Sequence, residues 1–139
     1  MTAERSFVDT NIWFYAFVCG ESEDDQRKNK IAQHLVKSRR ELSIQVINEL
    51  SVNLIRKAKY NEPELQKLIE SFFYHHRVHA LTRQTLTCAS TIRSRYAISF
   101  WDSLIASTAL ENDCATLYSE DMQNGLVIDH SLTIINPFT

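Results

Sequence analysis

The chain has 139 residues, of which 44% are hydrophobic and 23% are charged, and its formal net charge is −2. This size and balance are typical of one globular domain over residues 1–139, and they exclude a disordered or fibrous chain. The charge excludes a broad basic surface that binds nucleic acid through phosphates alone, so any contact with nucleic acid is expected to be local.

The first half of the chain repeats a pattern of a short apolar run followed by a helix-length apolar segment. In chain order, the expected elements are a strand over residues 6–8, a helix over 12–18, a polar loop over 20–25, a helix over 26–38, a strand over 42–44 and a helix over 46–58.

The second half continues with longer helical segments and closes with short strands. Asn61 and Pro63 resemble the first turn of a helix whose buried face runs over residues 65–73. The further elements expected are a strand over residues 78–81, a helix over 82–96, a helix beginning at 99, and strands over 116–118, 126–128 and 132–135. This alternation predicts an α/β fold, a three-layer sandwich with a mostly parallel central sheet flanked by helices.

Acidic residues stand where the strands of such a sheet end, and these ends are the usual ligand-binding edge of a parallel sheet. Asp9 directly follows the first strand, and Glu120 and Asp121 follow the strand over 116–118. Asp102 lies in the first turn of the helix that begins at residue 99, and Glu49 lies within the first two turns of the helix over 46–58. We therefore expect these carboxylates to share one pocket.

Each acid also has a simpler structural role open to it. Asp9 is placed to cap a helix, and Ser99 with Asp102 has the spacing of a capping box. The combination is harder to explain in this way, because two carboxylates about 5 Å apart repel by roughly 3 kcal/mol at an effective dielectric of 20. A divalent cation offsets this repulsion, and magnesium prefers oxygen ligands. Such a site favours hydrolysis of phosphodiesters.

At these acids the sequence resembles the PIN-domain ribonucleases and, within them, the VapC-like toxins of toxin–antitoxin pairs. The likeness spans positions 7–125 in the order of the family, whereas the polar stretch over 20–27 is less typical. The segments that carry it are FVDTN at 7–11, QVINEL at 45–50, SFWDSLI at 99–105 and LYSEDMQNG at 117–125.

The resemblance implies roles for individual residues. Two polar neighbours, Asn11 and Ser119, would orient the acids or the attacking water, and Glu120 is an alternative to Asp121 as the last acid. The residues implied to be catalytic and to bind the metal are Asp9, Glu49, Asp102 and Asp121.

The resemblance also implies the activity and the partners. It implies endonucleolytic cleavage of RNA that depends on Mg²⁺ or Mn²⁺. It further implies a homodimer and inhibition by a cognate antitoxin protein, a segment of which occupies the groove.

Two other functions remain open from the residues alone. The first is a non-catalytic module that binds RNA or protein and uses the acids to hold a structural metal ion. The second is a phosphoryl-transfer domain with Asp9 as the acceptor. In the phosphatase version of that domain a second aspartate follows two places after the first, and Asn11 occupies that place.

Several other patterns favour structural or negative predictions. The longest apolar run, residues 12–19, is far shorter than the roughly 20 residues needed to cross a bilayer, so we expect a cytoplasmic protein with no membrane span.

Two glycines are too few for a P-loop, a dinucleotide fingerprint or a nucleophile elbow. The three cysteines are widely spaced and are expected to be buried thiols. A zinc site at His75, His76 and His79 is not expected, because a strand there would break the helical spacing.

Overall fold

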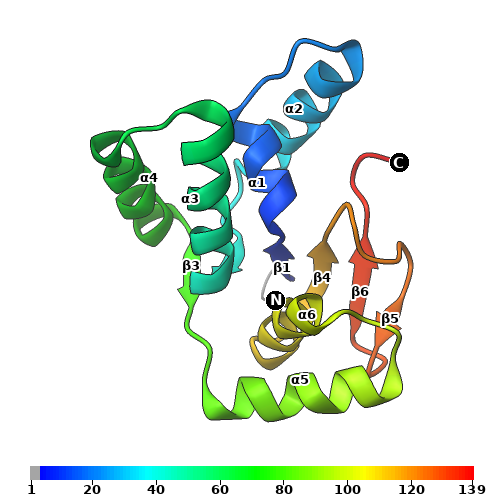
Figure 1. Ribbon diagram of the computed structural model, residues 1–139. Coiled ribbons are helices and arrows are strands. Elements are labelled where there is room, and N and C mark those ends of the chain that lie inside the picture. Colours follow the sequence, from blue (N-terminus) through cyan, green and yellow to red (C-terminus); the bar gives the residue numbers. More distant parts are fainter. Residues whose placement is uncertain (1–3) are drawn as a thin grey trace.

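A computed structural model describes residues 4–139 of the chain. Over these residues the chain forms a six-stranded sheet and the helices that flank it (Figure 1). The strands are β1 (Arg5–Val8), β2 (Glu41–Ser43), β3 (Arg77–His79), β4 (Cys114–Tyr118), β5 (Val127–Ile128) and β6 (Leu132–Ile135). The helices are α1 (Thr10–Phe17), α2 (Glu23–Leu35), α3 (Ile44–Ala58), α4 (Glu62–His75), α5 (Arg83–Arg95) and α6 (Phe100–Glu111).

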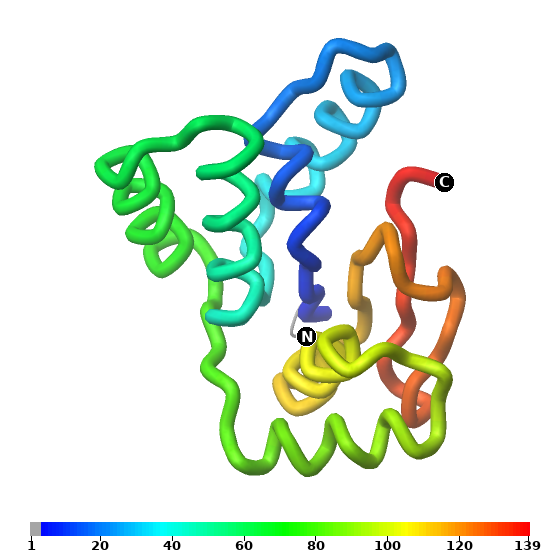
Figure 2. Tube along the Cα trace, viewed as in Figure 1, coloured from blue at the N-terminus to red at the C-terminus, as the bar shows by residue number. Residues whose placement is uncertain are grey.

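The order of the strands in the sheet is β3-β2-β1-β4-β6-β5, and every neighbouring pair is parallel except β5 with β6. The chain leaves β1 toward β2 and β3, and then returns to the other side of β1 as β4. Figure 2 shows this return, in which the blue first strand lies beside the much later segment of β4. A parallel sheet opens a ligand-binding crevice at such a reversal, beyond the carboxyl ends of the two strands.

Two groups of helices flank the sheet. Helix α1 packs against α2 and α3, whereas α6 packs against α5 and lies against β4 and β2. In Figure 1, α5 and α6 lie together at the lower side of the sheet, and α3 and α4 gather at the left. The predicted α/β architecture, with a mostly parallel sheet between helices, is therefore confirmed. Its core contains fully buried side chains from both groups and from the strands, including Phe7, Trp13, Leu50, Ile105, Leu117 and Ile134.

The boundaries of several elements differ from the prediction by a few residues. Helix α2 begins at Glu23, because Ser22 accepts a hydrogen bond from the Asp25 backbone and three acidic residues follow it in the first turn. Carboxylates there are stabilised by the helix dipole, so the polar stretch predicted as a loop over 20–25 is partly helical. Ile44 belongs to α3 and not to the strand, since Ser43 caps that helix. Strand β3 covers residues 77–79 rather than 78–81.

The cysteines and histidines also have defined places. Only Cys114 is buried; Cys88 is partly buried and Cys19 is exposed, so the prediction of three buried thiols was wrong for these two. His76 is the C-cap of α4, and its ring Nδ1 accepts a hydrogen bond from the Arg40 backbone N–H at 3.0 Å. His79 lies in β3, 3.1 Å from the buried carboxylate of Glu41.

No helix between residues 4 and 139 is both long enough and apolar enough to cross a membrane.

Candidate active site

Asp9 stands at the crevice between β1 and β4, and the backbone at both strand ends holds it there. Its N–H donates to the Tyr118 carbonyl at 3.0 Å, which continues the pairing of the two strands by one residue. Its side chain caps α1, because Oδ1 accepts a hydrogen bond from the Thr10 N–H at 2.7 Å. The capping role that the sequence left open is therefore real. The cap holds the carboxylate in a fixed position at the carboxyl ends of β1 and β4.

Ser119 fixes the second oxygen of the same carboxylate. Its hydroxyl donates to Asp9 Oδ2 at 2.9 Å, and the side chain is fully buried. The Ser119 N–H donates to the Ile135 carbonyl at 3.0 Å, so β6 holds the residue from its other side. The Ser119 hydroxyl also accepts the Met122 N–H at 3.3 Å. Ser119 thus connects the Asp9 carboxylate to the turn after β4.

Glu49 reaches the site from α3. It is an exposed residue, and its Oε1 accepts a hydrogen bond from the Thr10 hydroxyl at 3.1 Å. Thr10 therefore connects two acids: its backbone N–H binds Asp9 and its side chain binds Glu49. Because Thr10 itself is buried, this link is fixed by the packing of α1. Asp9 and Glu49 are separated by 40 positions in the sequence but share one bridging residue.

Asp102 enters from α6, on the opposite group of helices. The Ser99 hydroxyl caps this helix by accepting the Asp102 N–H at 3.3 Å, which leaves the carboxylate of Asp102 free of the cap. Asp102 is partly buried. Its negative charge contributes to raising the pKa of both Asp9 and Glu49, so the three carboxylates are within electrostatic reach of one another.

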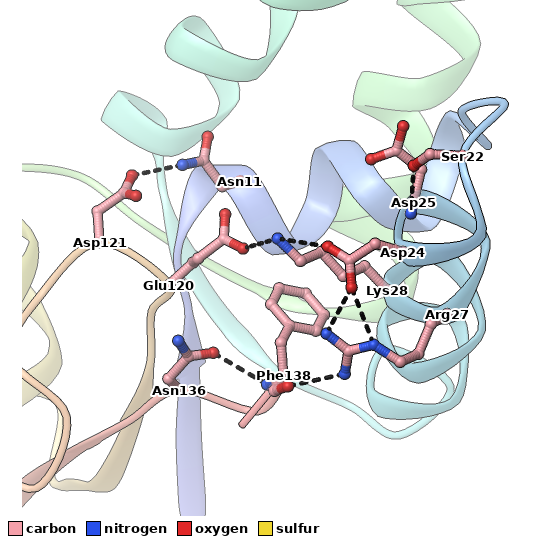
Figure 3. Close-up of polar contacts among 10 residues, drawn as sticks. All are labelled: Asn11, Ser22, Asp24, Asp25, Arg27, Lys28, Glu120, Asp121, Asn136 and Phe138. Carbon is pink, nitrogen blue, oxygen red and sulfur yellow. Dashed lines mark hydrogen bonds and ion pairs between the residues drawn. The ribbon is translucent and has the colours of Figure 1, made fainter.

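Asp121 and Glu120 follow β4 but have different partners (Figure 3). Asp121 is exposed, and its Oδ2 accepts a hydrogen bond from the Asn11 amide at 2.5 Å. Glu120 turns toward α2 and forms an ion pair with Lys28 at 2.5 Å. Lys28 neutralises Glu120, whereas Asp121 faces the start of α1 with no cation within ion-pair distance among residues 4–139. Of the two, Asp121 is the one that contacts α1, through Asn11, two residues after Asp9.

The crevice disfavours negative charge. Burial raises the pKa of Asp9 to about 6, and the charges of Asp102 and Glu49 add to the effect, although the hydrogen bonds from Thr10 and Ser119 oppose it. Although Glu49 is an exposed residue, its carboxyl group is partly buried, and this partial burial raises its pKa, with a further contribution from Asp102. Raised pKa values on neighbouring carboxylates indicate a site that gains from a bound cation.

The donor types around Asp9 are those that a hard divalent cation prefers. It consists of carboxylate oxygens, with an amide from Asn11 and hydroxyls from Thr10 and Ser119 close by. Magnesium and manganese take oxygen ligands and commonly retain water in their coordination shells. In the conformation described for residues 4–139, no three His, Cys, Asp or Glu side chains have the close spacing of a complete metal site.

The profile of one protein family, the PIN domain, matches residues 6–123 of the chain. The chain belongs to the PIN domain family. The match covers both strands that form the crevice and all four acids, and it agrees with the resemblance drawn from the sequence motifs. No curated protein matches the chain at a significant level.

Solved structures share the fold of this PIN domain at low sequence identity. A chain described as a toxin–antitoxin complex from Klebsiella pneumoniae has a TM-score of 0.70 and 16% identity, and the match covers 95% of this chain and 97% of that one. VapC20 of Mycobacterium tuberculosis, described as a toxin that cleaves the sarcin–ricin loop, has a TM-score of 0.66 and 20% identity over 84% of this chain and 89% of that one.

Two residues of this PIN domain site were not identified from the sequence. Thr10 lies inside the first motif, between Asp9 and Asn11, and its bridging role depends on α3 lying beside α1. Lys28 lies on α2, only 18% of its side chain is exposed, and it binds Glu120. No signal in the sequence singles out this pair, because Arg27, Lys28 and Lys30 all lie within four positions of one helix.

Proposed function

We propose that this PIN domain is an endoribonuclease that depends on Mg²⁺ or Mn²⁺ and hydrolyses phosphodiester bonds of RNA. The observation that carries the proposal is the meeting of Asp9, Glu49 and Asp102 at the crevice between β1 and β4, where burial raises the pKa of Asp9 to about 6. Holding ionised carboxylates close together in a partly buried place is unfavourable, and functional sites commonly contain such groups. A bound divalent cation offsets the repulsion between them.

In this proposal the four acids hold the metal and the neighbouring side chains position the acids. A bound divalent ion supplies positive charge for the phosphate and lowers the pKa of the attacking water. Thr10 and Ser119 hold the two oxygens of Asp9 in place, and Thr10 also holds Glu49. Asn11 holds Asp121 at the rim. The protein therefore provides a prearranged set of oxygens, and RNA brings its negative charge to the cation rather than to the acids.

The biological role that we propose is that of the toxin in a toxin–antitoxin pair. The similarity to a chain of the Klebsiella pneumoniae toxin–antitoxin complex and to VapC20 supports this assignment. The proposed role also includes a cognate antitoxin protein as the partner, a homodimer as the active assembly and the cytoplasm as the location. Size-exclusion chromatography with light scattering tests the homodimer directly.

The deciding experiment is cleavage of cellular RNA by purified wild-type protein and by Asp102→Asn, with magnesium and with a chelator. Asp113→Asn is a matched control, because Asp113 precedes β4 at the other end of the strand and has a positive φ of 57°, which asparagine adopts readily. We expect the wild type and Asp113→Asn to cut RNA only with the metal. We expect Asp102→Asn to lose at least about 100-fold in rate while its melting curve shows a folded protein.

Two results would overturn the proposal. One is turnover by Asp102→Asn at the rate of the control, and the other is cleavage that persists in the presence of chelator. Metal-dependent binding of RNA without new RNA ends would instead establish the alternative function, a non-catalytic module with a structural ion.

A further inference from the structure

A pocket of about 490 Å³ opens directly beside the acidic crevice. It lies between the first turns of α3 and α6 and the connection from β3 to α5, and Glu49 belongs both to its wall and to the acidic site. Its volume falls in the range of pockets that bind small organic groups. The lining residues are Ile44, Gln45, Asn48, Glu49, Leu81 and Trp101.

The wall of the pocket combines a flat aromatic surface with hydrogen-bonding amides. Trp101 is 63% exposed, although it directly precedes Asp102 on α6 and most of this helix is buried. Ile44 is also exposed and adds apolar surface. Asn48 is exposed one position before Glu49 and offers both a donor and an acceptor. The wall is largely apolar and has a few polar atoms from the amides, so it fits the flat face of an aromatic ring.

Gln45 adds a hydrogen-bonding preference. Its Nε2 donates to the Trp101 carbonyl at 3.3 Å, which fixes the orientation of the amide and connects α3 to α6. Its Oε1 is buried and has no hydrogen-bond partner among the described residues. An unsatisfied buried acceptor is unfavourable, so a ligand N–H that reaches it after a small rotation of the Gln45 side chain gains a partner that the free protein leaves open.

We propose that this pocket binds an unpaired nucleobase of the RNA substrate, next to the phosphodiester bond that is cut. The inference rests on the proposed function, because Glu49 lines the pocket and is also one of the acids proposed to bind the metal. Trp101 stacks on the base, and Asn48 and Gln45 contact its polar edge. Aromatic side chains bind any base by stacking, and Asn and Gln side chains distinguish bases through their hydrogen bonds. The pocket therefore sets a preference for the nucleotide that flanks the cut.

The test uses a short single-stranded RNA whose cleavage site has been mapped with the wild-type protein. Each nucleotide beside the cut is replaced in turn by an abasic one, and KM and kcat are measured for the wild type, Trp101→Ala and Trp101→Phe. At one position we expect base removal to raise the wild-type KM about tenfold with little change in kcat. Trp101→Ala should have this higher KM with the intact RNA and show no further change with the abasic RNA. Trp101→Phe should retain most of the base effect.

Tyr74→Ala provides the matched control, because Tyr74 is an aromatic residue on α4 that is 83% exposed and does not line the pocket. Its kinetics with both RNAs should equal those of the wild type. If base removal has the same effect on Trp101→Ala as on the wild type at every position, the base subsite is refuted. That result differs from failure of the proposed function, in which the wild type cuts no RNA in a metal-dependent way.

A second copy of the chain is the rival occupant of this apolar wall. Sedimentation of Trp101→Ala, without RNA, distinguishes the two. Loss of a dimer that the wild type forms, together with equal abasic effects in both proteins, would assign Trp101 to an interface between copies and overturn the inference. An unchanged oligomeric state with the expected abasic pattern supports the base subsite.

Discussion

Asp9 shows how one side chain is fixed by structure and kept available for chemistry. Both of its oxygens accept hydrogen bonds, one from the Thr10 backbone and one from the Ser119 hydroxyl. These bonds favour the ionised form, yet burial and two neighbouring carboxylates still raise the pKa to about 6. In the metal-free protein the folded state therefore binds the Asp9 proton more tightly than the unfolded state, where the pKa is near 3.8.

The sign of the resulting pH dependence follows from this difference. The stabilising proton is fully bound below about pH 4 and is lost as the pH rises through about 6, so this group lowers the free energy of unfolding over that interval. The raised pKa of Glu49 acts in the same direction. We expect Asp9→Asn to be more stable than the wild type at pH 7 without metal, by about 2 kcal/mol.

Chemical denaturation at pH 4.5 and pH 7 measures this difference. Asparagine retains an oxygen for the Thr10 cap and carries no charge, so the gain should appear at pH 7 and nearly vanish at the lower pH. Equal or lower stability of Asp9→Asn at pH 7 would contradict a crowded acidic site.

At the scale of elements, helix α2 and the segment after β6 hold the turn that carries Asp121. Lys28 on α2 binds Glu120, and its ammonium lies 5.1 Å and 5.6 Å from the ring centroids of Tyr15 and Phe138. The hydrogen bond to Glu120 raises the pKa of Lys28, so its charge is retained. Arg27 on the same helix donates to the Phe138 carbonyl at 2.7 Å (Figure 3).

This arrangement predicts that Lys28→Met weakens metal binding without touching an acid of the site. Removing the ammonium leaves Glu120 unpaired and partly buried, which should cost about 1–3 kcal/mol of stability and loosen the adjacent Asp121. Titration of RNA cleavage with magnesium should show a several-fold higher midpoint for Lys28→Met. Lys30→Met, an exposed change on the same helix, is the control. Equal midpoints for the two variants would show that the ion pair does not position Asp121.

The order of helices and strands was predicted from apolar periodicity and from capping residues, because these are local properties. The beginning of α2 was missed because three consecutive acids resemble a loop until Ser22 is recognised as their cap. The exposure of Cys19 was also missed, since composition alone does not specify which side of a turn a residue occupies.

Over the whole molecule, the reversal of the chain between β1 and β4 brings the site together. The sequence predicted that the four acids lie near one edge of the sheet, because each follows a strand or lies in the first two turns of a helix. The hydrogen bonds and ion pairs around these acids were not predicted, because each depends on the packing of helices that are distant in sequence. The bridge from Thr10 to Glu49 needs α1 beside α3, and the ion pair between Lys28 and Glu120 needs α2 beside the end of β4. Local sequence patterns do not specify which distant elements pack together.

Metal binding should stabilise the whole domain, since the cation relieves repulsion only in the folded state. At a magnesium concentration one hundred times the dissociation constant, the expected gain is about 2.7 kcal/mol. Differential scanning fluorimetry should therefore show a higher melting temperature for the wild type with magnesium and little change for Asp102→Asn. A similar shift for both proteins would place the stabilising ion away from the acidic crevice.

The hydrogen bond from Ser119 to Asp9 joins residues 110 positions apart. While a ribosome is still adding the second half of the chain, Asp9 has emerged but β4 and the turn after it do not yet exist. A nascent polypeptide of this kind has no assembled hydrolytic centre until residue 121 has left the exit tunnel and β4 has paired with β1. The strand order thus delays assembly of the acidic site until β4 has been synthesised and has paired with β1.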